Sequence, residues 1–192
     1  MPFRIVAVLA VILFSISLCA QQPVSETGTP LNLQTLVDAQ FGAGFSVDPK
    51  FKALSADFDS DGAEDMAIVA IAKNPLANSI DKKFKVVDPY DGYFGFGDTK
   101  ITTKFSNFGD GTSHCVLIIH DWNSSNPKAK FVIVNLPFEK LELGKTPYKK
   151  KSVVGLSAQE GGGLNAMVFF DGKKYRWEPS EFSQDFDQLK AQ

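Results

Sequence analysis

Acidic side chains alternate along a nine-residue stretch, and this spacing suits the binding of a cation. Residues 57–65 read DFDSDGAED. A loop that curls around an ion directs its first, third and fifth side chains inward, and glycine at the sixth position permits the sharp turn. The stretch offers hard oxygen ligands and no histidine or thiolate, a set that suits Ca²⁺ better than Zn²⁺. We therefore predict a Ca²⁺ site with the ligands Asp57, Asp59, Asp61, the backbone carbonyl of Ala63, and Asp65.

The flanking residues indicate which kind of calcium loop this is. An EF-hand requires a bidentate glutamate at position 12 and a helix after the loop. Position 12 is Ile68, and the apolar run Met66–Ala72 is typical of a strand. The stretch 56–75 instead resembles FG-GAP and VCBS-type repeats, in which the loop Asp-x-Asp-x-Asp-Gly-x-x-Asp precedes an apolar strand. This resemblance covers about a tenth of the chain, in a single copy, and implies that calcium is bound by Asp57, Asp59, Asp61 and Asp65.

Two histidines flank the apolar run Cys115–Ile119 and are the second candidate for chemistry. His114 and His120 are an even number of residues apart, so on a strand they point to the same face. His120, next to Asp121, could act as a general base. The simpler interpretation is that both are polar strand ends that meet solvent.

Aromatic residues crowd into the glycine-rich segment PYDGYFGFG. They are Tyr90, Tyr93, Phe94 and Phe96. If these rings are exposed, they suit a protein partner or a carbohydrate ligand. Aromatic side chains that fold back over the core are the alternative interpretation.

The N-terminal residues have the order of a secretory signal peptide. Arg4 precedes an apolar run from Ile5 to Phe14, and small and polar residues follow up to Ala20. We expect cleavage of residues 1–20, a flexible polar lead over 21–30, and a secreted or periplasmic protein without a stable membrane span. The alternative is a lipoprotein anchored through Cys19.

The composition is that of a soluble globular domain. The chain has 192 residues, of which 44% are hydrophobic and 22% charged, with a net charge of −2. Cleavage would remove one of the 20 basic residues and none of the 22 acidic ones, so that the net charge becomes −3. This balance argues against nucleic acid as a partner. Cys115 would be the one remaining cysteine, and its apolar neighbours predict a buried, inert thiol.

Residues 31–192 are predicted to form a single β-rich domain. The fold class is mainly β, with α+β as the alternative, and the sheet is mostly antiparallel with short N- and C-terminal flanking helices. Asn32 can cap the first helix and Gly42 can end it, and Ser180 can cap the last. Apolar runs of strand length predict interior strands at 66–72, 115–119, 131–136 and 164–170. Weaker strand predictions are 84–87, 101–105 and 153–157.

The clearest predicted hairpin has the two-residue loop Asp171-Gly172, a dipeptide typical of type I′ turns. This loop would pair Phe170 with Lys173, Val168 with Tyr175, and Ala166 with Trp177. It would place Val168, Phe170, Tyr175 and Trp177 on one face, which we expect to be the core face.

Two functional hypotheses follow from these residues. The leading one is a secreted, non-enzymatic domain with one structural calcium loop, acting as a binding module. The alternative is a small secreted hydrolase that uses His120 and nearby carboxylates, with calcium only stabilising it. The acidic stretch itself has a simpler interpretation, as a surface turn in which aspartates merely favour the bend.

Overall fold

The computed structural model describes residues 32–72, 74–95, 114–161 and 165–180. Helix α1 (Leu33–Phe41) begins as the sequence predicts, because the Asn32 side chain accepts a hydrogen bond from the Thr35 N–H at 3.2 Å. It ends at Gly42, which has a φ of +93°. The predicted helix after Ser180 and the predicted strand 101–105 lie outside the described residues. Within the described ranges, no helix is long and apolar enough to cross a membrane.

The first sheet has its longest strands at its centre. In spatial order, β1, β3, β5, β6 and β4 lie side by side, and β2 also pairs with β3. All neighbours are antiparallel except β4 and β6. The strands are β1 (Phe45–Val47), β2 (Leu54–Ala56), β3 (Asp65–Ala72), β4 (Lys85–Val87), β5 (His114–His120) and β6 (Ala129–Ile133).

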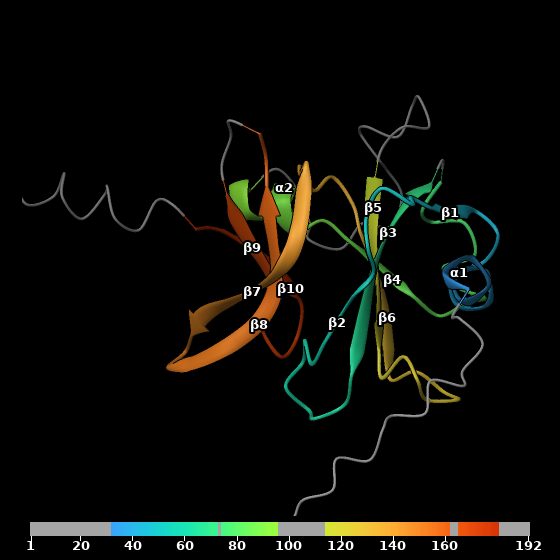
Figure 1. The fold of residues 1–192 in the computed structure, drawn as a ribbon, viewed down its shortest axis with the longest axis horizontal. Helices are drawn as coiled ribbons and strands as arrows, with labels where there is room; N and C mark the ends of the chain where they lie inside the picture. Colours follow the sequence, from blue (N-terminus) through green and yellow to red (C-terminus); the bar gives the residue numbers. More distant parts are fainter. Residues whose placement is uncertain (1–31, 73, 96–113, 162–164, 181–192) are drawn as a thin grey trace, which may run out of the picture. The chain divides into compact units, whose positions relative to one another are not determined.

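The second sheet is a fully antiparallel meander, drawn in orange and red in Figure 1. Its spatial order is β10, β9, β8, β7, so that β10 and β7 are its edges. The strands are β7 (Lys140–Tyr148), β8 (Lys151–Gln159), β9 (Ala166–Phe170) and β10 (Tyr175–Pro179).

The core has two main layers, one on each face of the first sheet, and a smaller third cluster of Val153, Met167 and Phe169 belongs to the second sheet. Along β5, Val116 and Ile118 pack with residues of the second sheet, whereas Leu117 and Ile119 pack with α1. This alternation follows from the two-residue repeat of a strand, and burial on both faces explains the continuous apolar runs. The prediction of a mainly β, mostly antiparallel single domain is confirmed.

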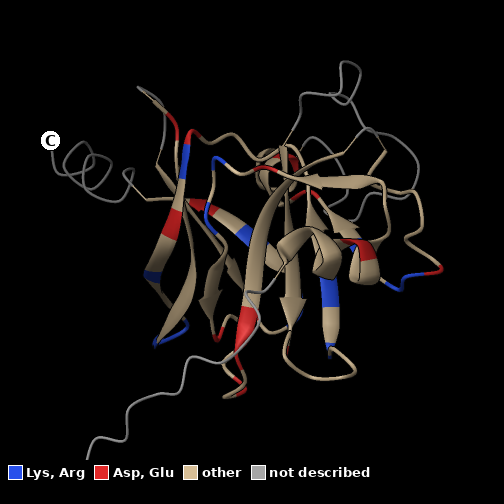
Figure 2. Ribbon diagram, turned by 45° about the vertical axis from the view of Figure 1, so that its right-hand side comes forward, with Lys and Arg blue, Asp and Glu red and all other residues tan. Residues whose placement is uncertain are grey.

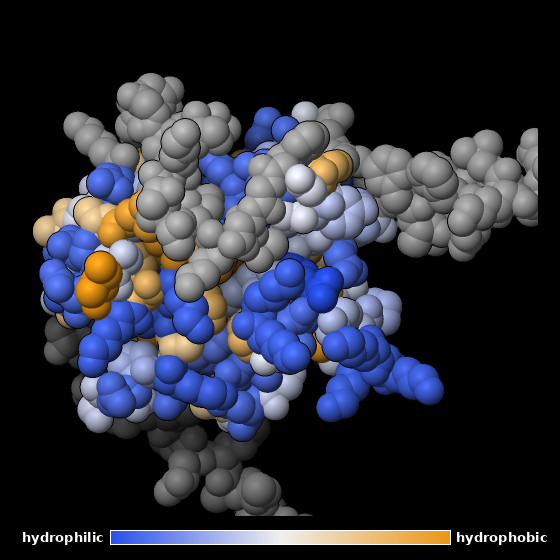
Figure 3. All heavy atoms as spheres, turned by 180° about the vertical axis from the view of Figure 1, so that it is seen from behind, coloured by the Kyte–Doolittle hydropathy of each residue, from blue (hydrophilic) through white to orange (hydrophobic). Residues whose placement is uncertain are grey.

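Seen from behind, most of the described surface is hydrophilic (Figure 3).

Cys115 points into the layer beneath α1 and is fully buried. Burial raises the pKa of its thiol, so it stays protonated and unreactive, as predicted.

The C-terminal hairpin differs from its predicted register by two residues. The observed pairs are Phe170 with Tyr175, Val168 with Trp177, and Ala166 with Pro179, so the two-residue loop is Gly172-Lys173. The reason is the side chain of Asp171, which accepts hydrogen bonds from the Lys173 and Lys174 N–H groups at 2.9 Å each. Asp171 therefore precedes the turn instead of lying within it.

A shift of two residues does not move any side chain to the other face of a strand. The four residues predicted to share the core face still do so: Val168, Tyr175 and Trp177 are buried in the layer between the sheets, and Phe170 packs against it.

A short helix that was not predicted from the sequence begins directly after β4. Helix α2 (Pro89–Phe94) carries proline in its first turn, and the carboxylate of Asp88 caps it by accepting from the Asp91 N–H at 2.9 Å. It lies against β10 and holds three of the aromatic residues noted in the sequence.

Candidate metal centre

The acidic stretch forms the connection between β2 and β3. Because Ala56 pairs with Asp65, residues 57–64 must reverse the chain between two adjacent antiparallel strands. Two residues in this connection have positive φ, Ser60 at 62° and Gly62 at 90°. These left-handed positions curl the loop, and Gly62 is the residue that takes such a conformation without strain.

Asp57 and Asp61 fold the loop onto itself. The carboxylate of Asp57 accepts hydrogen bonds from the N–H groups of Asp61 and Gly62, at 3.1 and 3.0 Å. Asp61 in turn accepts from the Ala63 N–H at 2.9 Å. The aspartates therefore shape the turn, as the simpler interpretation of the sequence expects.

The loop also brings together three of the four carboxylates predicted to bind calcium. Oxygen atoms of Asp57, Asp59 and Asp61 all lie within 4.8 Å of one another. Asp65 belongs to a second group, with Asp59 and His120, whose ligand atoms meet the same limit. Asp59 is therefore shared by both groups, one near the surface and one buried.

Asp65 is fully buried and holds backbone N–H groups from two segments. Its carboxylate accepts from Phe58 at 2.8 Å and from Asp121 at 2.9 Å. Burial raises the pKa of this carboxyl. Asp65 thus ties the start of the acidic loop to the turn after β5.

Lys128 contacts the carboxylates of Asp59 and Asp61, and no pattern in the sequence indicates this contact. Its Nζ atom is 2.7 Å from Asp59 Oδ2 and 2.6 Å from Asp61 Oδ2. Hydrogen bonds to these aspartates raise the pKa of Lys128, and the hydrogen bond from Lys128 is the main reason that the pKa of Asp61 falls to about 2. The side chain of Lys128 is nevertheless 52% exposed. Basic and acidic residues are interspersed along the described ribbon (Figure 2).

Asp59 has one oxygen that the described structure leaves without a partner. Its side chain is only 4% exposed, and Oδ2 is engaged by Lys128. Oδ1 is buried and has no hydrogen-bond partner, a condition shared among the described side chains only with Asn135 Oδ1. A buried oxygen without a partner costs about 1–3 kcal/mol, so a bound cation or donor at this position would be stabilising.

His120 connects Asp59 to the second sheet. Its Nδ1 lies 3.2 Å from Asp59 Oδ2, and its Nε2 lies 2.7 Å from the hydroxyl of Tyr175. The side chain is 2% exposed. The expectation that this strand end meets solvent is therefore wrong for His120, because the second sheet covers it. His114 behaves as expected, since it is partly exposed and contacts Asp48 at 2.7 Å.

The aromatic residues of α2 are both packed and exposed. Tyr90, Tyr93 and Phe94 each contact the buried Trp177, with ring centroids 4.9 to 5.6 Å apart. Tyr93 and Phe94 are nevertheless 50% and 42% exposed. The rings of Tyr93 and Phe94 therefore pack on the core with one part and face solvent with another, so that each of the two interpretations holds in part. Phe96 lies outside the described residues.

Comparison of the chain with protein-family models, with curated proteins and with solved structures found no match.

Proposed function

We propose that this protein is a secreted or periplasmic, non-enzymatic binding domain, with one Ca²⁺ bound by the loop between β2 and β3. The proposed ligands are carboxylate oxygens of Asp57, Asp59 and Asp61 and the carbonyl of Ala63. The observation that carries the proposal is the convergence of the carboxylates of Asp57, Asp59 and Asp61, together with the buried Oδ1 of Asp59, which has no hydrogen-bond partner among the described residues. The resemblance of the stretch to FG-GAP and VCBS-type loops supports the same ion.

Lys128 sets the conditions under which calcium would bind. Its ammonium group neutralises one of the three negative charges, whereas Ca²⁺ would neutralise two and accept more oxygen ligands. Because the lysine side chain is half exposed, it can leave for solvent when the ion arrives. We therefore expect calcium to compete with Lys128, and the affinity to fall in the weak range of about 10⁻⁴–10⁻³ M seen for extracellular modules.

Asp65 positions the loop in this proposal. It holds the N–H groups of Phe58 and Asp121 and so fixes where the loop begins relative to β5. Its role as a direct calcium ligand stays a prediction.

The geometry favours binding over hydrolysis. A general base must reach a proton of the substrate, but both ring nitrogens of His120 face buried protein groups, Asp59 and Tyr175. Burial also raises the pKa of Tyr175, which makes its hydroxyl a poor nucleophile. The exposed rings of Tyr93 and Phe94 support a binding role instead.

Thermal unfolding with calcium and with chelator tests the metal site. Calcium should raise the melting temperature of the wild type, because an ion that binds only the folded state stabilises it by mass action. Asp59→Asn and Asp61→Asn should lose this response. Lys128→Met should melt at a lower temperature in chelator but respond to calcium at lower concentrations, because the competing ammonium is gone.

Lys140→Met is the matched control, since it removes a lysine from a surface pair with Glu142 far along the chain from the loop. It should leave the calcium response unchanged. If millimolar calcium shifts neither the wild type nor Lys128→Met, the loop is an acidic turn closed by lysine.

The proposed compartment has its own test. The intact mass of the exported protein should match a chain that begins at Gln21. A mass that includes a lipid on Cys19 would replace soluble release by membrane anchoring.

A further inference from the structure

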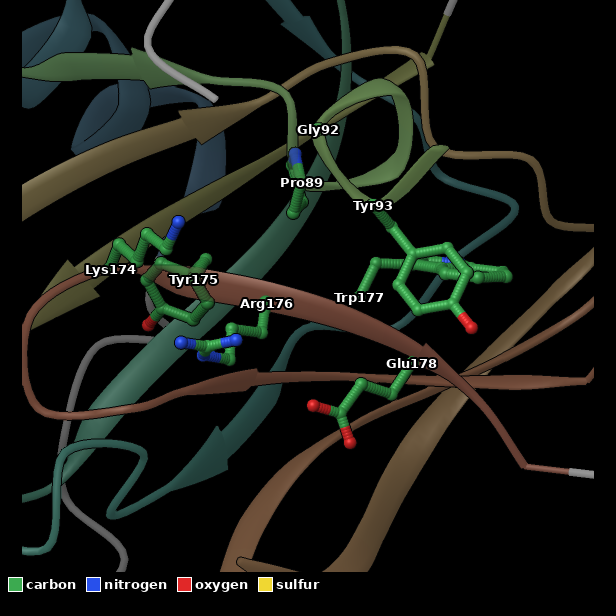
Figure 4. Close-up of a pocket in the computed structure, with 8 residues that line it drawn as sticks. All are labelled: Pro89, Gly92, Tyr93, Lys174, Tyr175, Arg176, Trp177 and Glu178. Atoms are coloured by element: carbon green, nitrogen blue, oxygen red, sulfur yellow. The ribbon is translucent and has the colours of Figure 1, made fainter. Parts of the chain in front are cut away.

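A cavity of about 140 Å³ lies between α2 and β10. Its walls are Pro89, Gly92 and Tyr93 from α2 and the five consecutive residues 174–178 (Figure 4). Side chains of a strand alternate between two faces, so a cavity on one face would be lined by every second residue. Five consecutive lining residues indicate that the cavity runs along the backbone edge of the strand.

The topology agrees, because β10 is an edge of the second sheet. The N–H of Asp171 donates to the Lys174 carbonyl, and the N–H of Ser180 donates to the Asn165 carbonyl. These two bonds fix which residues of β10 direct their backbone groups toward β9 and which direct them away. Arg176 and Glu178 direct their backbone groups to β9, whereas Tyr175 and Trp177 direct theirs outward. Among the described residues, no hydrogen bond to another segment uses the outward groups of Tyr175 or Trp177.

We propose that this groove binds an extended peptide segment of a partner protein, which adds to β10 as a further strand. The outward N–H and C=O groups of Tyr175 and Trp177 would pair with the peptide backbone, the mode known as strand addition. Pro179 ends the usable edge, because it has no N–H to offer.

The side chains around the groove specify the chemistry of the peptide. Lys174 lies at one end and Glu178 at the other (Figure 4). A short peptide with an acidic group toward Lys174, a basic group toward Glu178 and an apolar side chain between them complements this arrangement. The apolar side chain would pack on Tyr93, which is half exposed and is held by contact with Trp177 at 4.9 Å.

Backbone amide exchange in the isolated monomer tests whether the edge is free. The N–H groups of Tyr175 and Trp177 should exchange much faster than those of Arg176 and Glu178, which are bonded to β9 and serve as controls in the same strand. Protection of the Tyr175 and Trp177 amides in the monomer would overturn the proposal, because another segment of the chain would then occupy the edge. Protection that appears only at high protein concentration would assign the edge to a second copy of the chain, and would also overturn the proposal.

Binding is tested with random heptapeptides displayed on phage and selected on the full protein, followed by synthesis of the selected sequences. A selected peptide should protect the Tyr175 and Trp177 amides, and N-methylation of its backbone should weaken binding at least about tenfold, since strand addition depends on main-chain hydrogen bonds. Gly92→Leu, which fills the groove from α2, should weaken binding to a similar degree. Leu143→Ser is the control, because Leu143 is an exposed apolar residue on β7, the opposite edge of the sheet.

Two outcomes contradict strand addition: selection that yields no binding peptide, and a selected peptide whose affinity is unchanged by N-methylation and by Gly92→Leu. The groove shares no residue with the proposed calcium ligands, so failure of the calcium site leaves this test unaffected.

Discussion

The acidic loop and the groove between α2 and β10 are candidate binding sites built in different ways. In the loop, the binding groups are side-chain carboxylates supplied by alternate residues of one short stretch, and Asp57, Asp59 and Asp61 converge because the chain turns sharply. In the groove, the binding groups are backbone atoms of Tyr175 and Trp177, which are outward only because β10 is an edge strand. A site made of side chains leaves a pattern in the sequence, whereas a site made of backbone groups does not.

The two regions also differ in what supports them. The loop depends on Asp65, His120 and Lys128, which reach it from β3, β5 and the segment before β6. The groove depends on one turn and one short helix, each close in sequence to the residues that line it. We therefore expect substitutions of the buried residues that support the loop to lower stability more than substitutions beside the groove.

The largest effect is expected for Asp65→Ala. Removal of this buried carboxylate leaves the N–H groups of Phe58 and Asp121 without partners, and we expect a loss of roughly 3–5 kcal/mol in the free energy of unfolding. Urea denaturation measures it. Asp65→Asn keeps one acceptor oxygen and should lose less. If Asp65→Ala costs no more than Asp57→Ala, whose hydrogen bonds are exposed, the supporting role assigned to Asp65 is wrong.

The second prediction concerns pH and the cap of α2. Burial is the main reason that the pKa of Asp88 rises to about 6. Because this value lies above the usual 3.8, the folded protein holds the proton between pH 4 and 6 while the unfolded chain releases it. Asp88 therefore lowers stability as pH rises through this window, by up to about 3 kcal/mol.

Denaturation of wild type and Asp88→Asn at pH 4, 5, 6 and 7 measures this contribution. The variant should lose less stability over the same range. Asp81→Asn, at an exposed position, is the control and should follow the wild type. If the free energy of unfolding depends equally on pH in the wild type and in Asp88→Asn, the charge of Asp88 does not lower the stability of the protein.

The smallest effect is expected in the turn that leads into β10. Gly172 has a φ of +93°, and nothing lies within 4 Å of the position of an added Cβ, so the cost of Gly172→Val comes from backbone strain alone. We expect a loss of about 1–2 kcal/mol. Lys173→Val, at the neighbouring loop position, lacks a positive φ and is the matched control. Equal costs for the two variants would contradict the observed turn.

Much of the fold could be predicted because apolar patterning is local. Consecutive apolar residues indicated the central strands β3 and β5, and the side chain of Asn32 indicated the start of α1. The hairpin shows where local patterns stop: the alternation of Val168, Phe170, Tyr175 and Trp177 predicted the correct face, but the register was wrong by two residues. Two registers that differ by two residues bury the same side chains, so the hydrophobic pattern does not separate them.

The sequence by itself determined that three aspartates would converge on a sharp loop, because their spacing and Gly62 act within nine residues. Tertiary structure alone decided that Lys128 would lie on that loop, that the second sheet would bury His120, and that the edge of β10 would face α2. The reason is physical. Each of these arrangements joins segments that are remote in the chain, and the pairing of strands and the packing of the two sheets set the positions of those segments.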